Sequence, residues 1–286
     1  MKFVIYGFMI CFIAFTACGK KEYDLTVMTF NVRYDNPADG FNRWEYRIPI
    51  ITTYMDTTSA DIIGMQEVLH NQIVDLQKMI PDYAYTGTGR DDGKQRGEYS
   101  PIFFRKDRFT LLDHSQFWLS ETPDIPGSRS WDAAITRIVC WAKLEDKKSG
   151  EHIYVFNTHF DHRGVEARQK SIELMTIKIN EITDNSPVIV TGDFNIRKGS
   201  EHYDFMVHNF SENNALTNAE LISKAPVTDA ESTFNGFRTE GVSGVIDFIF
   251  VNDDFVVNSY RVDNVIKNGV FISDHWPVIS KIVYHK

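Results

Sequence analysis

The segment from His152 to Asn195, HIYVFNTHFDHRGVEARQKSIELMTIKINEITDNSPVIVTGDFN, contains two strand-like runs separated by a helical pattern. The runs 152–160 and 187–195 are short and rich in β-branched and aromatic residues, which favours β-strands. Between them, apolar side chains recur at spacings of three and four, at Ile172, Met175, Ile179 and Ile182. This spacing predicts a helix over 165–183 whose apolar stripe packs on a sheet.

The same two patterns continue along the chain. Further strand-like runs, most of them bounded by turn residues, occupy 25–32, 61–68, 99–105, 114–120, 137–145, 245–252 and 277–285. Weaker helical patterns cover 44–59 and 71–79. Many strands with a few covering helices predict an α/β fold in which two sheets pack face to face with helices outside. The chain contains no internal repeat and no linker-like composition, which indicates one domain.

The first 17 residues have the form of a signal peptide. A lysine precedes an apolar run over 3–15 that is too short for a spanning helix. Small residues just before Cys18 resemble the lipobox of bacterial lipoproteins, whose cysteine is acylated. We therefore expect a signal peptide over 1–17, a lipid anchor on Cys18, a tether over 18–25 and one domain over 26–286.

This interpretation places the protein on the cell envelope of a Gram-negative bacterium, at the periplasmic face or the cell surface. The alternative is an ordinary secretory signal followed by a chance cysteine. Either way, Cys140 is the single cysteine left in the body of the mature chain, so no intramolecular disulfide forms there. A lone cysteine in an apolar run is typical of a buried small hydrophobe.

The net charge of −9 and the pI near 5.5 count against a dedicated nucleic-acid binder, which is usually basic. Acidic residues that bind a cation would, however, reverse the local field. Polar residues cluster where strands end, at Asn31, Glu67, Asn157, His159, Asp193, Asn195 and Asp247, with Asp274 and His275 just before the last strand. Loops at strand ends are where a rigid scaffold displays chemistry.

Residue type indicates a role for several of these positions. Glu67 ends an apolar strand and is a hard oxygen ligand suited to Mg²⁺, unless it simply faces solvent. Asp193 could orient or deprotonate a water while Asn195 donates to a phosphate oxygen; the alternative is an Asx turn. Neighbours in an extended chain point to opposite sides, so Asp274 could face a metal and His275 the substrate.

Two further carboxylates need partners. Asp247 lies within an apolar strand, and a buried aspartate that holds a histidine in one tautomer forms a general acid–base pair. Its alternative partners are a lysine or a backbone turn. Glu98 could serve another histidine in the same way, but its polar loop is equally consistent with a solvated charge.

Taken together, the motifs resemble the endonuclease/exonuclease/phosphatase superfamily, which includes pancreatic deoxyribonuclease, inositol polyphosphate 5-phosphatases and neutral sphingomyelinases. The resemblance extends from Thr26 to Val283 and rests on motifs in the family's order: TFNVR (29–33), MQEV (65–68), GEYSPIFFR (97–105), NTHF (157–160), TGDFN (191–195), ID (246–247) and SDHWPV (273–278).

The resemblance implies a four-layer α/β/β/α sandwich and hydrolysis of a phosphoester by in-line attack of water. It also implies Mg²⁺ or Mn²⁺ held mainly by Glu67, with Asn31 and Asp274 nearby. Protons and developing charge would be handled by two braced histidines, His275 with Asp247 and His159 with Glu98. In the same scheme, Asp193 positions the water and Asn195 a phosphate oxygen.

A zinc site is the rival interpretation of NTHFDHRG (157–164). The metallo-β-lactamase fold uses H-x-H-x-D-H-x-G after a strand, but Asn157 stands where the first histidine belongs, and an amide is a poor zinc ligand. This interpretation also leaves the motifs at 191–195 and 273–278 unexplained. We instead expect substrate contacts from residues around the site, namely Asn157, Arg33, Asp161 and His162, with Arg90, Arg163 and Arg168 as further candidates. The alternatives are a surface pair for Asp161 and His162 and a solvated surface position for each arginine, which is the more common case for an arginine taken alone.

The favoured substrate is a phosphorylated sugar, glycan or other small phosphomonoester, hydrolysed by a monomeric enzyme. An extracellular nuclease acting on DNA or RNA and a sphingomyelinase-like phosphodiesterase are the alternatives. A lipoprotein that binds ligands without catalysis is a fourth possibility, although each motif retains its catalytic residue types.

Overall fold

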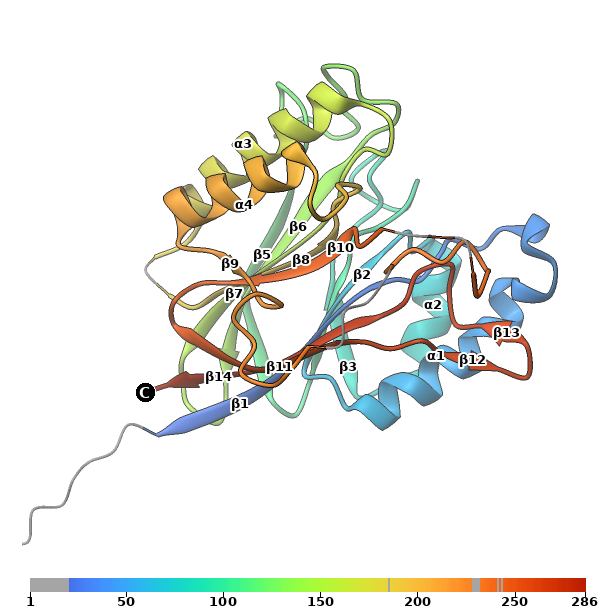
Figure 1. The fold of residues 1–286 in the computed structure, drawn as a ribbon, viewed down its shortest axis with the longest axis horizontal. Helices are drawn as coiled ribbons and strands as arrows, with labels where there is room; N and C mark the ends of the chain where they lie inside the picture. Colours follow the sequence, from blue (N-terminus) through green and yellow to red (C-terminus); the bar gives the residue numbers. More distant parts are fainter. Residues whose placement is uncertain (1–20, 185, 228–231, 241, 243) are drawn as a thin grey trace, which may run out of the picture.

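The computed structural model describes residues 21–184, 186–227, 232–240, 242 and 244–286. Two six-stranded mixed sheets pack face to face, and helices cover their outer faces (Figure 1). This arrangement confirms the predicted four-layer α/β/β/α sandwich. The predicted signal peptide and Cys18 lie outside the described residues, and no described helix is long and apolar enough to cross a bilayer.

The first sheet has the strand order β11-β14-β1-β2-β4-β3. Within it, β1 and β2 are parallel and the other neighbours are antiparallel. The strand bounds are β1 Glu22–Asn31, β2 Ile62–Gln66, β3 Tyr83–Thr86, β4 Ile102–Arg105, β11 Phe255–Val262 and β14 Val278–His285.

The second sheet has the order β5-β6-β7-β8-β10-β9, in which β7 and β8 are the parallel pair. Its strand bounds are β5 Phe109–Trp118, β6 Ile138–Asp146, β7 His152–His159, β8 Val188–Asp193, β9 Thr217–Asn218 and β10 Asp247–Val251. A small hairpin of β12 (Ile266–Lys267) and β13 (Val270–Phe271) lies beside the first sheet.

Within the described residues, four α-helices form the outer layers. The first sheet is covered by α1 (Trp44–Thr58) and α2 (His70–Met79), with the 3₁₀ helix η1 (Pro37–Asn42) beside them, and the second by α3 (Val165–Ile182) and α4 (Glu201–Asn214). The predicted helices at 44–59, 71–79 and 165–183 are confirmed. Helix α4 was not predicted, although Ser200 caps it by accepting a hydrogen bond from the backbone N–H of Tyr203.

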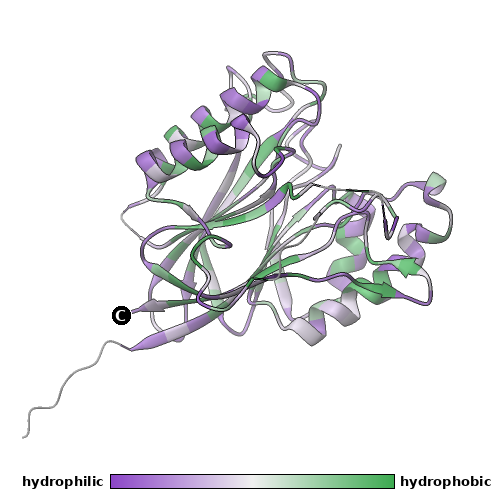
Figure 2. Cartoon of the chain, viewed as in Figure 1, coloured by the Kyte–Doolittle hydropathy of each residue, from purple (hydrophilic) through white to green (hydrophobic). Residues whose placement is uncertain are grey.

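Three apolar layers hold the sandwich together. The central layer lies between the sheets and contains Val27, Ile62, Val155, Ile189 and the buried thiol of Cys140. A second layer lies between the first sheet and α1 and α2, and a third between the second sheet and α3 and α4. Helices α3 and α4 accordingly alternate hydrophobic and hydrophilic residues along their length (Figure 2), and the residues they bury include Ile172, Met175, Met206 and Phe210. The position of Cys140 confirms its prediction as a buried small hydrophobe.

Candidate active site

The two parallel pairs bring the predicted polar residues to one end of the sandwich. Asn31 ends β1 and Glu67 follows β2 in one sheet, while His159 and Asp193 end β7 and β8 in the other. Asp247 begins β10, directly opposite Asp193 in an antiparallel ladder. The Asn31 amide donates to Asp193 Oδ2 at 3.0 Å and so joins the two sheets at this end.

His275 is held between two aspartates. Its Nδ1 lies 2.9 Å from Asp247 Oδ2, and its Nε2 lies 3.7 Å from Asp193 Oδ2. Burial alone would lower the pKa of His275, but the charges of Asp247 and Asp193 outweigh it and raise the pKa to about 10. His275 is therefore a buried imidazolium at neutral pH, and Asp247 has the histidine partner considered from the sequence.

His159 contacts the Asp193 carboxylate, which also lies near His275. Its Nε2 lies 3.4 Å from Asp193 Oδ2. Burial, followed by the charges of Arg137 and Arg90, lowers the pKa of His159 well below its usual value, so this imidazole is neutral. Asp193 thus lies between one charged and one neutral imidazole.

Glu98 does not hydrogen-bond to His159. The prediction that Glu98 braces His159 by a hydrogen bond is therefore wrong. Its Oε2 is 4.0 Å from His159 Nδ1, which has no hydrogen-bond partner among the described residues. Both Glu98 oxygens instead accept from Arg90, at 2.7 and 2.9 Å. A bidentate guanidinium outcompetes a neutral imidazole for a carboxylate because its hydrogen bonds are charge-assisted.

Asp193 has the properties of a general base. Burial and the nearby charge of Asp247 raise its pKa to about 7. Its Oδ1 accepts the backbone N–H of Asn195, whose side-chain amide donates to the Phe160 carbonyl. That contact uses one of the two amide hydrogens of Asn195, so the other can reach a phosphate oxygen.

Glu67 and Asp274 form an acidic pair suited to a divalent cation. Burial and the nearby charge of Glu67 raise the pKa of Asp274. The guanidinium of Arg33 lies near both, its Nη1 3.9 Å from Glu67 Oε2 and 3.6 Å from Asp274 Oδ2. The pair therefore already attracts a cation, and with the Asn31 amide oxygen it offers the hard donors that Mg²⁺ prefers.

A second group of possible metal ligands is formed by Asp193, Asp247 and His275, whose ligand atoms lie within 4.8 Å of one another. His275 Nδ1 is hydrogen-bonded to Asp247, and its raised pKa keeps the ring protonated. A metal at this group would have to displace the His275 proton, whereas Glu67 and Asp274 offer carboxylate oxygens, the ligand type that Mg²⁺ prefers. The Glu67 and Asp274 side of the site is therefore the better metal site.

Three non-glycine residues of the site have left-handed backbone conformations, with φ of 59° at Arg33, 62° at Glu67 and 50° at Asn195. Such conformations cost on the order of 1 kcal/mol each and persist where surrounding structure enforces them. Each one lies within two residues of the end of β1, β2 or β8, where the chain leaves the sheet at the site.

Asn157 and Asp161 are internal, and the predictions that they contact substrate are wrong. Asn157 is fully buried, donates to the carbonyls of Met65 and Pro101, and accepts from Gln66 and Thr191. It therefore links the two sheets. Asp161 is 1% exposed and accepts four backbone N–H groups, those of Ala134, Ile135, Arg163 and Gly164. Its role is to fix two loops.

The structure adds residues that the sequence did not indicate. Arg137, just before β6, is buried under the exposed His162, with its Nη2 3.2 Å from His162 Nδ1.

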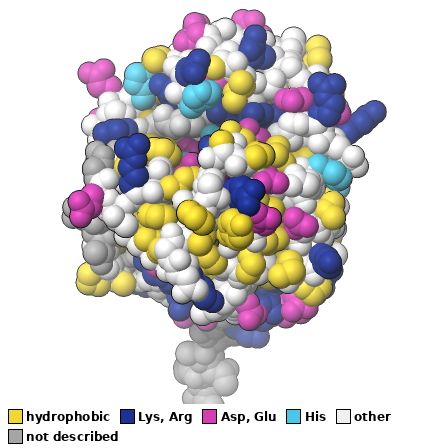
Figure 3. Space-filling view, turned by 90° about the vertical axis from the view of Figure 1, so that its right-hand side faces the viewer, with side chains coloured by type: hydrophobic (Ala, Val, Ile, Leu, Met, Phe, Trp, Pro, Cys, Tyr) yellow, Lys and Arg dark blue, Asp and Glu magenta, His cyan; other side chains and the backbone are white. Residues whose placement is uncertain are grey.

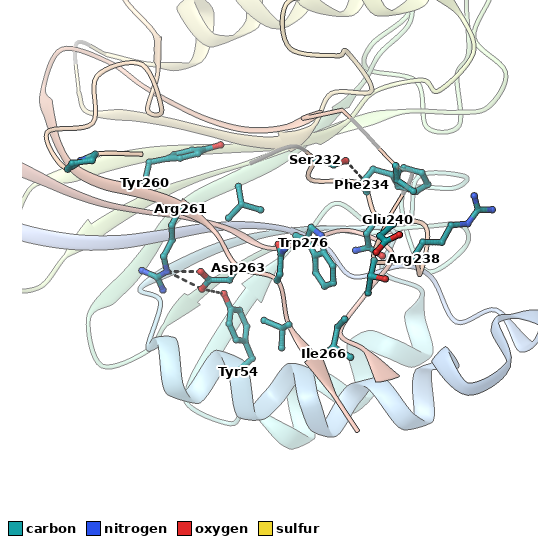
Figure 4. Close-up of a pocket in the computed structure, with 17 residues that line it drawn as sticks. Tyr54, Ser232, Phe234, Arg238, Glu240, Tyr260, Arg261, Asp263, Ile266 and Trp276 are labelled. Carbon is teal, nitrogen blue, oxygen red and sulfur yellow. Dashed lines mark hydrogen bonds and ion pairs between the residues drawn. The ribbon is translucent and has the colours of Figure 1, made fainter. Parts of the chain in front are cut away.

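A second unpredicted residue is Phe234, whose ring packs edge-on against His275 with 5.1 Å between the ring centroids. Phe234 also borders a cavity of about 820 Å³ whose walls include Arg238, Glu240 and Trp276 (Figure 4). At its far end, Asp263 accepts hydrogen bonds from Tyr54 and Arg261.

Comparison with known proteins agrees with this geometry. The model of the Endonuclease/Exonuclease/phosphatase family matches residues 28–275. The crystal structure of an endonuclease/exonuclease/phosphatase from Bacteroides vulgatus is 41% identical, covers 91% of this chain and 98% of that chain, and superposes with a TM-score of 0.85.

Two further relatives have named activities. The mannosyl-6-phosphatase of Bacteroides thetaiotaomicron is 35% identical, covering 91% of this chain and 100% of that chain, with a TM-score of 0.83. The CCR4-Not complex 3'-5'-exoribonuclease subunit of Mycosarcoma maydis is 23% identical, covering 91% of this chain and 50% of that protein. The chain belongs to the Endonuclease/Exonuclease/phosphatase family and is a metal-dependent phosphoric ester hydrolase.

Proposed function

We propose that this protein is a Mg²⁺-dependent phosphomonoesterase, anchored to the cell envelope through Cys18, that releases phosphate from a phosphorylated sugar or glycan. The observation that carries the substrate class is the 35% identity to the mannosyl-6-phosphatase over 91% of the chain. The surface at the strand ends supports it. Figure 3 faces this end of the molecule and shows Lys and Arg side chains scattered among apolar and acidic ones, whereas proteins that track a nucleic-acid backbone have a continuous basic groove.

The side chains divide the chemistry between them. Asp193, ionised above pH 7, takes a proton from the attacking water, and the His275 imidazolium stabilises charge on the phosphate and supplies a proton to the leaving oxygen. His159, neutral, hydrogen-bonds the reacting groups from the opposite side of Asp193. Glu67, Asp274 and Asn31 would hold the divalent cation, which would supply Lewis-acid polarisation of a phosphoryl oxygen when bound.

A substrate panel tests the proposal. The purified protein is assayed with Mg²⁺ against mannose 6-phosphate, glucose 6-phosphate, phosphorylated mannan, DNA, RNA and sphingomyelin. We expect phosphate release from a sugar phosphate with a kcat/KM at least 100-fold above cleavage of any diester. Cleavage of nucleic acid or sphingomyelin without release from any monoester would show that the substrate class is wrong.

The activity should depend on pH through Asp193 and His275. Because Asp193 must lose a proton and His275 must keep one, kcat/KM should rise through about pH 7 and fall near pH 10. The charge of Asp247 raises both pKa values, so Asp247→Asn should move both limbs to lower pH. Rates measured from pH 4 to 11 for parent and variant check this, and an unmoved alkaline limb in Asp247→Asn would contradict it.

Phe234 should bind the leaving group. It is 37% exposed, touches His275 and borders the cavity beside it. We expect Phe234→Ala to lower kcat/KM for a sugar phosphate by about 10-fold, the size of a lost aromatic contact, and to leave methyl phosphate unaffected. Phe41→Ala, which removes a ring 85% exposed on η1, is the matched control. Equal losses on both substrates would instead point to damage at His275.

The anchor is tested separately. In the parent protein expressed with its N-terminus intact, Cys18 should be labelled by palmitate and the protein should sediment with membranes. Cys18→Ser should abolish the label and shift the protein to the soluble fraction, with kcat unchanged. A Cys18→Ser protein that still sediments with membranes rules out the lipid anchor.

A further inference from the structure

Beside His159, two arginines have buried hydrogen-bond donors that no acceptor satisfies. Among the described residues, Arg90 Nε, Arg137 Nε and Arg137 Nη1 are shielded from solvent without a hydrogen-bond partner. Glu98 lies 2.7 Å from Arg90 and 4.0 Å from His159, and Arg137 Nη2 lies 3.2 Å from His162 Nδ1, which accepts from it. We call Arg90 and Arg137 the donor cluster, and His159 and His162 lie beside it.

The two carboxylates next to the donor cluster are already occupied. Glu98 accepts both its hydrogen bonds from Arg90, and Asp161 accepts four backbone N–H groups. Arg137 Nε lies 3.9 Å from Asp161 Oδ2, which is an ion-pair distance but too long for a hydrogen bond. Neither carboxylate therefore satisfies the donors of Arg137.

One edge of the Arg137 guanidinium is suited to an anion. Nη1 has no partner, and Nη2 is held by His162 Nδ1 in a contact that is only partly buried. His162 itself is exposed. The two Nη atoms form the fork that matches two oxygens of a phosphate, and the contact with His162 is the Nη hydrogen bond that an incoming oxygen would replace.

The burial of Arg137 also favours a negatively charged ligand. The residue is 4% exposed, and burial together with the charge of Arg90 lowers its pKa to about 10, so it remains charged at neutral pH. A buried guanidinium with unused donors is unfavourable until an acceptor reaches it. A phosphate oxygen supplies both the acceptor and the charge.

We propose that Arg137 binds the third non-bridging oxygen of a phosphomonoester and thereby selects monoesters over diesters, with His162 as the residue that positions it. This inference rests on the proposed phosphomonoesterase function. A monoester presents three non-bridging oxygens and carries up to two charges, whereas a diester presents two oxygens and carries one charge. The additional oxygen and charge need an additional cationic donor, which the Nη edge of Arg137 provides.

The test compares two substrates with the same leaving group, p-nitrophenyl phosphate and bis(p-nitrophenyl) phosphate. Arg137→Met should lower kcat/KM for the monoester by about 100-fold, the effect of losing charge-assisted hydrogen bonds, and change the diester by less than about 3-fold. The inhibition constant of inorganic phosphate should rise by the same factor by which kcat/KM for the monoester falls. Arg137→Lys should recover only part of the loss because an ammonium lacks the fork.

Folding is monitored by thermal unfolding, and Arg129→Met, at an exposed arginine between β5 and β6, is the matched control. Should Arg137→Met fail to fold, Arg137→Lys carries the same comparison. Equal losses on monoester and diester, or no loss on either, overturn the inference. If the parent hydrolyses no monoester at all, the proposed function fails. In that case the role of Arg137 is tested by the rise in unfolding temperature that inorganic phosphate produces. An equal rise in the parent and in Arg137→Met overturns the inference.

Discussion

His275→Gln is expected to lower kcat for phosphoester hydrolysis by about 10³-fold, with a smaller effect on KM. The His275 ring is positively charged when it contacts the phosphate, because Asp247 and Asp193 raise its pKa to about 10. Glutamine keeps a hydrogen-bond donor of similar size but carries no charge and cannot release a proton. The loss should therefore fall on the chemical step, which single-turnover measurements separate from binding.

The effect should be specific to this histidine. His208→Gln, at an exposed position on α4, is the matched control and should keep parental kcat. The variant should also remove the alkaline limb of the pH profile, because the group that titrates near pH 10 is gone. A His275→Gln protein that is folded, retains more than about a tenth of parental kcat and keeps the alkaline limb would exclude His275 as the acid.

The sequence predicted the layers of the fold because hydrophobic periodicity is a local signal. The stripe on α3 and the short β-rich runs each specify an element without reference to the rest of the chain. Helix α4 carried a comparable signal, with Ser200 as its cap and Tyr203, Met206 and Phe210 buried along one face. It could have been predicted from these residues.

Hydrogen-bond partners were less predictable, because they depend on contacts between residues distant in the chain. Asn157 matches a motif shared with catalytic residues, yet its hydrogen bonds reach Met65 and Pro101 in the opposite sheet. Glu98 was paired with a histidine 61 positions away, whereas Arg90, eight residues earlier in the same loop, forms its hydrogen bonds. An arginine at a strand end, such as Arg137, is usually solvated, so its burial beneath His162 had no signal in the sequence.

The site accordingly has two electrostatically distinct sides. Acidic Glu67 and Asp274 occupy one side, where Arg33, hydrogen-bonded to Asp39, brings its Nη1 to 3.9 and 3.6 Å from the two carboxylates, and the donor cluster occupies the other side. Asp193 lies between the two sides and is tied to the acidic side through Asn31. This polarity fits a reaction in which a cation and basic side chains approach one phosphate from opposite directions.

Glu67→Gln should have its largest effect on the metal. The substitution removes one of the two carboxylates that crowd Arg33 and leaves an amide of the same shape, so the fold should be retained. Changing even an indirect support of a metal ligand costs 10–100-fold in affinity, and loss of a direct carboxylate ligand should cost at least about 100-fold.

The measurement of Glu67→Gln is the Mg²⁺ concentration that gives half-maximal activity, together with calorimetric titration of the metal in the absence of substrate. EDTA should abolish the activity of the parent, and Mg²⁺ should restore it. Glu45→Gln, at an exposed glutamate in the first turn of α1, is the matched control and should bind Mg²⁺ as the parent does. If Glu67→Gln bound Mg²⁺ with the affinity of the parent and Asp247→Asn lost Mg²⁺ affinity instead, the metal would lie beside Asp193 and His275. The Arg33 guanidinium argues against that result, because its Nη1 lies 3.9 Å from Glu67 and 3.6 Å from Asp274, which shows that these carboxylates attract a positive charge.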